Sequence, residues 1–173
     1  MHKQIVGEID PSLGYVRALS DQGYVIEVES GGIKHVLKTE TPRFKSFIRK
    51  EYEVLQIARG VPGINHLVRE YRDIAGFDLV LLKEFFPGED LRNLKTKIAD
   101  TKVQRQLLET VKALHSLGVG CLDILPKNVL LSLDGTQARL FDFDTTILAR
   151  DCICNFEEIK TEDFRRLETM IFS

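Results

Sequence analysis

One segment, GCLDILPKNVLLSLDGTQARLFDFDTT at positions 120–146, constrains the fold of this chain more than any other. Its two apolar runs, VLLSL and ARLF, flank Asp134-Gly135, a dipeptide that favours a tight turn between antiparallel strands. The segment is therefore predicted to form a β-hairpin. Asp123 and Asn128 precede the first strand and Asp142 follows the second, so strand pairing is expected to bring the three side chains to one edge.

These polar side chains are unusual beside strands that look built for a core. Carboxylate and amide oxygens are the hard ligands that Mg²⁺ takes together with waters and phosphate oxygens. Asn128 and Asp142 would supply such ligands, which leaves Asp123 for an acceptor hydroxyl. Taken one at a time, each residue also has a structural explanation: Asp123 could cap a turn, Asn128 could hydrogen-bond the loop and Asp142 could end a strand. The pattern favours a metal–phosphate site and leaves the structural explanation open.

The first half of the chain is predicted to form a small antiparallel sheet with one helix. GYVRAL, GYVIEVES and IKHVLKT are typical of short strands, and Ser30-Gly31-Gly32 supplies a turn between the last two. A helix is expected next, from Thr41-Pro42 until Gly60, because apolar residues recur at helical spacing. HLVREYRD and FDLVLLKEFF indicate two further strands. PGEDL then breaks the pattern, and we place a lobe boundary between residues 86 and 87.

The second half is predicted to contain two helices around the hairpin. The first is amphipathic, and its apolar residues recur at helical spacing: Val103, Leu107, Leu108, Val111 and Leu114. The C-terminal stretch TEDFRRLETMIFS has the same periodicity and acids in its first turn, which predicts a closing helix.

The composition excludes several functional classes. Of 173 residues, 43% are hydrophobic, enough for one domain or two small lobes, and the formal net charge of -2 gives no basic field for nucleic acid or anionic membranes. The first residues, MHKQIVGEID, lack the apolar stretch typical of a signal peptide, and no run approaches roughly 18 apolar residues, so we expect an intracellular, cytoplasmic protein without a membrane partner. The three cysteines are expected to be reduced thiols, although Cys152 and Cys154 could contribute to a metal site.

Two motifs in the central segment resemble the catalytic core of the protein kinases. CLDILPKNVLL is similar to their catalytic loop, and LFDFD is similar to their DFG segment. The resemblance implies that Asp123 is the catalytic base, that Asn128 is the magnesium-binding amide and that Asp142 is the metal-binding acid. It also implies that ATP and Mg²⁺ are the cofactors.

Other motifs of the family occur upstream in the expected order. HVLK resembles the third-strand motif, which makes Lys38 the phosphate-binding lysine. The helix that follows offers Glu51 and Glu53 as partners for this lysine. We choose Glu51, because it shares the inward face of the helix with Ile48 and Leu55.

LVLLKEFFPGEDL resembles the last small-lobe strand and the hinge that presents backbone groups to adenine. The resemblance assigns the backbone contacts to Glu84 and Phe86 and places Asp90 near the ribose. Gly23 remains of the glycine-rich loop that covers the nucleotide. Lys83, just before the hinge, would direct a second cation at the pocket. Further on, ALHSLGVG resembles the end of the helix before the catalytic loop, with a structural role for its histidine, His115.

The chain also departs from the family pattern. Cys121-Leu122 replaces the usual His-Arg pair, Leu125 replaces a lysine on the γ-phosphate side, and Asp144 stands where the DFG glycine belongs. The chain ends at Ser173 without an APE motif or the length of a full helical large lobe, as in a minimal or truncated kinase. Asp163 could correspond to the acid that opens the central helix of that lobe.

Together these observations predict an α+β, two-lobe protein-kinase-like fold. Residues 1–86 would form an antiparallel small-lobe sheet plus one helix, and residues 87–173 a shortened, mainly helical large lobe. The expected function is transfer of the γ-phosphate of ATP to a protein hydroxyl, Ser or Thr rather than Tyr. Two alternatives remain open: a pseudokinase that acts as a binding module, and a small-molecule phosphotransferase of the aminoglycoside or choline type.

Overall fold

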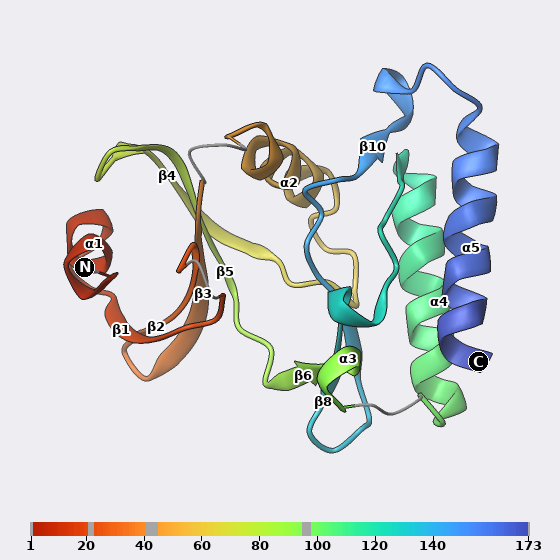
Figure 1. Cartoon of the computed structure of the whole chain (residues 1–173), viewed down its shortest axis with the longest axis horizontal. Coiled ribbons are helices and arrows are strands. Elements are labelled where there is room, and N and C mark those ends of the chain that lie inside the picture. The colour runs from red at the N-terminus through yellow and green to blue at the C-terminus, as the bar shows by residue number, and fades with distance from the viewer. Residues whose placement is uncertain (1, 21–22, 41–44, 95–97, 173) are drawn as a thin grey trace. The chain divides into compact units, whose positions relative to one another are not determined.

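The computed structural model describes residues 2–20, 23–40, 45–94 and 98–172 of the chain. It is an α+β protein whose described part contains five α-helices and a five-stranded antiparallel sheet (Figure 1). Contacts within the chain divide it into two compact units. Unit 1 comprises Met1–Glu53 and His66–Phe85, and unit 2 comprises Val54–Asn65 and Phe86–Ser173.

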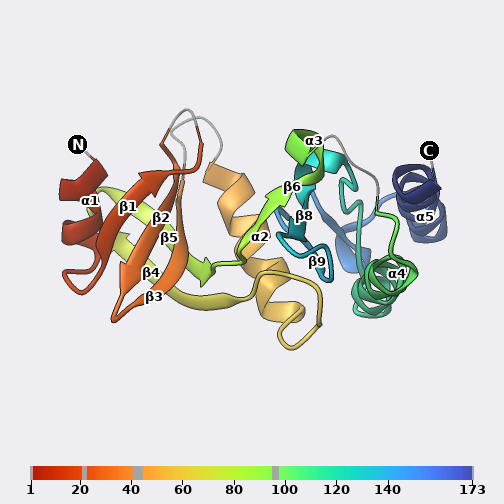
Figure 2. The same cartoon turned by 90° about the horizontal axis from the view of Figure 1, so that it is seen from below.

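Unit 1 is built on the five-stranded sheet, whose strands lie in the order β1-β2-β3-β5-β4 (Figure 2). All neighbouring strands are antiparallel. The strands are β1 (Gly14–Ala18), β2 (Val25–Ser30), β3 (Ile33–Thr39), β4 (Leu67–Ile74) and β5 (Phe77–Glu84). Each one lies in a segment that the alternating sequence pattern predicts as a strand, and Gly31 and Gly32 turn between β2 and β3 with φ of 58° and 80°.

One face of this sheet packs against an N-terminal helix that the sequence reading missed, α1 (His2–Ile9) (Figure 2). The buried cluster joins residues of α1 and the loop after it to alternate residues of β2, β3 and β5: Val6, Ile9, Leu13, Ile26, Val28, Leu37, Val80 and Leu82. Because side chains alternate along a strand, Lys38 and Lys83 point to the opposite face.

The opposite face of the sheet faces the beginning of α2 (Lys45–Ile57), the helix expected after β3. The predicted start at Thr41-Pro42 and the apolar residue Phe44 lie outside the described residues. Within unit 1, Tyr52 of α2 donates a hydrogen bond to Glu70 of β4 at 2.8 Å. The helix ends at Ile57, three residues before Gly60, which has a φ of 87°.

Unit 2 contains α3 (Leu91–Leu94), α4 (Thr101–Ser116) and α5 (Phe156–Phe172), and α4 and α5 lie side by side (Figure 1). Asp100 caps α4, because its side chain accepts a hydrogen bond from the backbone of Lys102 at 2.6 Å. α5 begins at Phe156, five residues before the predicted start. Asn155 is responsible for this earlier start, since its Oδ1 accepts from the Glu157 backbone at 3.1 Å.

Besides its helices, the described part of unit 2 contains two small sheets. The hairpin is present as β8 (Val129–Ser132) and β9 (Ala138–Leu140), and β8 also pairs with β6 (Gly88–Asp90). β7 (Val119–Gly120) pairs with β10 (Ile147–Leu148), and the 3₁₀ helices η1 (Pro126–Asn128) and η2 (Ala149–Asp151) complete the unit. These short strands have too few residues to show the alternation from which longer strands are predicted.

Gly120 allows α5 to approach β7 closely. A Cβ atom at this position would lie 2.8 Å from a methyl carbon of Ile159 and 3.0 Å from the ring of Phe156, both on α5. Because these distances are shorter than ordinary carbon contacts, any larger residue would push α5 away. The glycine thereby helps to position the acids and arginines of α5 next to the loop that follows β7.

Candidate functional site

Unit 1 holds a buried cluster of one carboxylate and two lysines on the α2 side of the sheet. Glu51 is fully buried, with its Oε2 2.6 Å from Lys38 Nζ and its Oε1 2.5 Å from Lys83 Nζ. The lysine side chains are 15% and 7% exposed. The predicted ion pair between Lys38 and Glu51 is therefore present, and the second lysine binds the other oxygen of the same carboxylate.

The two lysines determine the charge of Glu51. Burial raises the pKa of its carboxyl group. The positive charges of Lys38 and Lys83 lower this pKa by more than burial raises it, and the resulting pKa is about 2. The cluster therefore contains one carboxylate and two ammonium groups in a part of the protein that is nearly closed to water. Because its two positive charges exceed its one negative charge, the cluster is suited to bind a further anion.

Strand alternation and helix periodicity explain why these three residues meet. In the sheet, Lys38 pairs with Leu81 and Lys83 pairs with Val36, so both lysines lie on the same face of adjacent strands. Glu51 faces them from α2, whereas Glu53 is 36% exposed and pairs with Lys50 at 3.2 Å. The choice of Glu51 over Glu53 as the partner of Lys38 is confirmed.

A second buried carboxylate, Glu27 of β2, was not predicted. Its two oxygens bind Arg17 of β1 and Lys34 of β3, both at 2.7 Å. Burial raises the pKa of Glu27, but Lys34 and Arg17 lower it more, so the net pKa lies below its ordinary value. The side chains of Arg17 and Lys34 are well exposed. The triad therefore links three neighbouring strands, and its positive charges remain at the protein surface. The sequence signal that could have found it is a glutamate between the apolar residues Ile26 and Val28 of a strand.

The four residues assigned to the nucleotide-binding region have separate structural contacts. In unit 1, Gly23 has a φ of 72° and donates its N–H to Ser20 O at 2.9 Å, and Glu84 donates its N–H to His66 O at 2.9 Å. In unit 2, Phe86 is buried and lies 4.8 Å beneath the guanidinium group of Arg139.

Asp90 of unit 2 caps the short helix α3. Its Oδ1 accepts a hydrogen bond from the Asn93 backbone at 2.9 Å, and its Oδ2 lies 3.6 Å from Arg92. The sequence assigns this residue to the ribose, and the structure gives it a local capping role.

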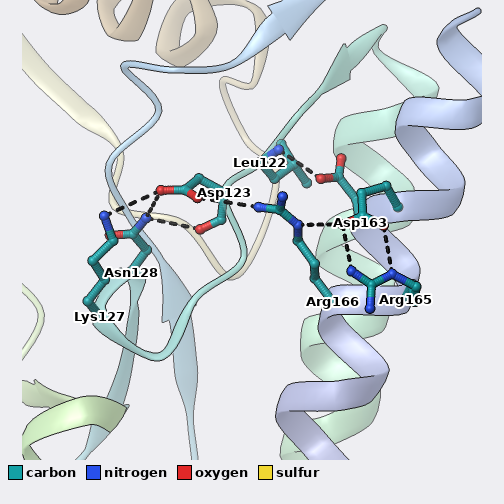
Figure 3. Close-up of polar contacts among 8 residues, drawn as sticks. Leu122, Asp123, Lys127, Asn128, Asp163, Arg165 and Arg166 are labelled. Carbon is teal, nitrogen blue, oxygen red and sulfur yellow. Dashed lines mark hydrogen bonds and ion pairs between the residues drawn. The ribbon is translucent and has the colours of Figure 1, made fainter.

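The loop between β7 and β8 in unit 2 brings Asp123 and Asn128 into direct contact. Asn128 Nδ2 donates to Asp123 Oδ2 at 2.9 Å and to the Asp123 backbone oxygen at 3.0 Å (Figure 3). Both donated bonds come from the nitrogen of the amide. The amide oxygen of Asn128, the atom able to bind a hard cation, takes no part in these two bonds.

Three residues near this contact have a left-handed backbone conformation that is uncommon outside glycine. Their φ values are 55° for Cys121, 44° for Asp123 and 70° for Asp142. Such conformations cost of order 1–3 kcal/mol each and persist where the surroundings enforce them, often at functional sites. All non-glycine residues of unit 2 with this conformation, within its described part, belong to the two motifs chosen from the sequence.

Two cations flank the carboxylate of Asp123. Lys127 Nζ lies 3.5 Å from Asp123 Oδ2, and Arg166 of α5 lies 3.5 Å from Asp123 Oδ1 (Figure 3). Leu122 and Leu125 stand where the kinase family has an arginine and a lysine, and Lys127 and Arg166 supply positive charge beside Asp123 from other positions. Lys127 is four residues after Asp123 rather than two, and Arg166 comes from a helix distant in sequence.

The backbone before Asp123 is held by Asp163 of α5. Asp163 Oδ1 accepts from the Leu122 N–H at 2.9 Å (Figure 3). Its Oδ2 lies 2.9 Å from His115 Nε2. Because a carboxylate only accepts hydrogen bonds, this contact puts the ring proton of His115 on Nε2. His115 also packs against the edge of the Phe164 ring, with the centroids 4.9 Å apart. The structure thus gives His115 the packing role expected for it.

Asp142 follows directly on the hairpin. The Phe141 N–H donates to the Asn128 backbone oxygen at 3.1 Å, which continues the pairing of β8 and β9 beyond Val129 and Leu140. Asp142 is therefore the next residue after a backbone contact with Asn128, as hairpin pairing predicts. Beyond it, Thr146 donates its hydroxyl to Phe143 O at 2.7 Å and closes a turn.

The chain matches no known protein-family model. Across residues 2–20, 23–40, 45–94 and 98–172, no three His, Cys, Asp or Glu side chains form a group able to hold a metal ion. The same ranges contain no helix with the length and apolar character needed to span a membrane.

Proposed function

We propose that this chain is a protein-kinase-like phosphotransferase that uses ATP and Mg²⁺ to phosphorylate a protein hydroxyl, Ser or Thr rather than Tyr. Each unit contributes one cluster to this proposal. Unit 1 contributes Lys38, Glu51 and Lys83, and unit 2 contributes the loop that contains Asp123 and Asn128. The chemistry of the two clusters is complementary, since one binds anions and the other offers oxygen atoms to a cation.

In the proposal, the lysine cluster of unit 1 holds the phosphates. Glu51 fixes the position of Lys38 Nζ at 2.6 Å, so that this ammonium group can bind the α- and β-phosphates without a search through side-chain rotamers. Lys83 adds a second cation on the other oxygen of Glu51. The backbones of Glu84 and Phe86 would contact adenine, Asp90 would lie near the ribose and Gly23 would cover the phosphates.

The loop of unit 2 would hold the metal and the acceptor hydroxyl. Asn128, through its amide oxygen, and Asp142 would bind Mg²⁺, which neutralises charge on the phosphates when bound. Asp123 would accept the hydrogen bond of the acceptor hydroxyl and orient its oxygen toward the γ-phosphate. Most of the rate enhancement would come from positioning and from electrostatic stabilisation rather than from proton transfer.

The observation that carries the proposal is the contact between Asn128 Nδ2 and Asp123 Oδ2 at 2.9 Å. It joins the expected base and the expected metal-binding amide in one partly buried contact, with a left-handed backbone at Asp123.

One observation favours a second candidate, a nucleotide-binding module without phosphoryl transfer. Asp123 Oδ1 already has a cation next to it, since Arg166 lies at 3.5 Å. An arginine in this position competes with an acceptor hydroxyl for the carboxylate. In this candidate the chain would act through protein partners, and the charge of Asp123 would have no effect on them.

Replacement of Asp123 by Asn separates the two candidates. The phosphotransferase requires that Asp123→Asn lower transfer to a generic protein substrate by about 100-fold or more while ATP affinity is retained. Asp134→Asn is the matched control, because Asp134 lies at the turn of the same hairpin and binds Ser132 and Thr136 only locally. Unchanged transfer in Asp123→Asn would refute the role of Asp123, and a wild-type chain that binds ATP without transfer would favour the binding module.

A further inference from the structure

Two cysteine thiols face each other in the segment between η2 and α5. Cys152 Sγ and Cys154 Sγ are 2.9 Å apart, and Cys152 Sγ also lies 3.1 Å from the Cys154 backbone oxygen. Both residues have free thiols. They take no part in the proposed phosphotransferase site, so the contact asks for a separate explanation.

The segment that carries the two thiols is open to solvent. Cys154 is exposed, Cys152 is partly exposed, and Ile153 between them is completely exposed at 105%. The three residues lie outside the helices and strands, although the Cys152 N–H donates to Ala149 O at 3.3 Å and closes η2. A disulfide needs sulfur atoms about 2.05 Å apart, and the two thiols are already within about 1 Å of that separation.

We propose that Cys152 and Cys154 form a reversible dithiol–disulfide pair whose oxidant is a low-molecular-mass disulfide such as oxidised glutathione. One cysteine thiolate attacks a sulfur of the oxidant and forms a mixed disulfide as the first glutathione thiolate leaves. The second cysteine thiolate then attacks the protein sulfur and expels the second glutathione thiolate. Two protein thiols are thereby oxidised, one glutathione disulfide is reduced to two thiols, and the two protons pass from the cysteines to glutathione.

The location of the pair makes such a bond reversible. It would close a loop of three residues in an exposed segment, and exposed disulfides of this kind are the more readily reduced ones. Closure of so short a loop restricts the unfolded chain less than closure of a long loop, so the bond is expected to stabilise the fold only modestly. The pair therefore suits a site that changes with the thiol–disulfide balance around the protein rather than a permanent cross-link.

The sequence offers a clean test of this proposal. Trypsin cleaves after Arg150 and Lys160, so one peptide contains Cys152 and Cys154, and Cys121 lies on another. The full chain is equilibrated in buffers of reduced and oxidised glutathione, both native and in urea, and free thiols are then alkylated. We expect the 151–160 peptide of the native chain to lose two hydrogen atoms and to resist alkylation. Its equilibrium constant for oxidation should exceed that in urea about tenfold, since the fold holds the thiols together.

Two variants serve as controls. Cys121→Ser should leave the oxidation of the peptide unchanged, and Cys154→Ser should give a glutathione adduct on Cys152 in place of the internal bond. The proposal is overturned if native wild type carries glutathione on both cysteines. Equal equilibrium constants in native buffer and urea would also overturn it, because the fold would then contribute nothing to the pair.

Discussion

Asp163 accepts a hydrogen bond at 2.9 Å from the backbone N–H of Leu122, the residue immediately before Asp123. The two residues are 41 positions apart in the chain. α5 thus holds the loop of the candidate site through Asp163 Oδ1, and the other oxygen of Asp163 contacts His115 on α4. The loop is fixed by one carboxylate that joins two helices to it.

We therefore expect Asp163→Ala to destabilise the protein by about 2–4 kcal/mol, because it leaves a buried N–H and a buried imidazole N–H without acceptors. Asp163→Asn should lose less, since its amide oxygen can still accept from Leu122. Urea unfolding measures both changes. Glu162, the partly exposed residue before Asp163, provides the control. The free energy of unfolding of Glu162→Gln should be close to that of wild type.

Hydrogen exchange gives a more local readout of the same contact. The Leu122 amide should exchange faster in Asp163→Ala than in Asp163→Asn when both are compared under native conditions. Equal protection of this amide in the two variants would show that Asp163 does not hold the loop.

The buried carboxylate of unit 1 predicts a dependence of stability on pH. The pKa of Glu51 falls from 4.5 to about 2 in the folded protein, so its ion pairs contribute stability above pH 4.5. That contribution should be lost as the pH falls from about 4.5 through about 2, since protonation then favours the unfolded chain. The shift corresponds to about 3 kcal/mol at neutral pH.

Glu51→Gln tests this dependence. At pH 7 the variant should be destabilised by about 3–5 kcal/mol, because two nearly buried lysines lose their carboxylate. The difference in the free energy of unfolding between wild type and variant should become smaller as the pH is lowered to 3. Glu53→Gln is the matched control, because Glu53 lies on the same helix but is 36% exposed, and this variant should follow wild type at every pH. A gap that stays constant between pH 7 and pH 3 would contradict the charge assigned to Glu51.

Lys83 is expected to bind phosphate and not only to neutralise Glu51. Lys83→Met keeps the length of the side chain and removes its charge, so ATP affinity should fall about tenfold while adenosine affinity stays the same. Lys34→Met is the control, because Lys34 also pairs with a buried glutamate, Glu27, on the same sheet. Calorimetry with ATP and adenosine distinguishes the outcomes. An ATP affinity within twofold of wild type would assign Lys83 a structural role alone.

Much of the fold was accessible from the sequence because its elements have strong local signals. Short runs of strand-forming residues bounded by turns predicted β1 to β5, and Asp134-Gly135 located the turn of the β8–β9 hairpin. α1 was missed because its eight residues carry few apolar side chains and only Val6 and Ile9 are buried in the core. Such a helix is stabilised by packing on the sheet more than by its own sequence.

The candidate site was predictable only where neighbours in sequence are also neighbours in space. Asp123 contacts Asn128 because both lie in one short loop. Lys38 pairs with Glu51 because a strand face and a helix face that are consecutive in the chain lie against each other. Arg166 could not be found in this way, because a long helix can present any of several faces to a distant loop. Lys127 could have been found, since it lies in η1 only four residues after Asp123.

The direct test of the central claim is calorimetric titration of the full chain with ATP, in Mg²⁺ and then in EDTA. We predict binding that weakens at least tenfold in EDTA and a similar loss in Asp142→Asn with Mg²⁺, because Asp142 is assigned to the metal. Asp144→Asn, two residues further on, is the matched control and should bind as wild type does. Absence of binding at millimolar ATP, or binding equal in Mg²⁺ and EDTA, would contradict a nucleotide–metal site in this protein.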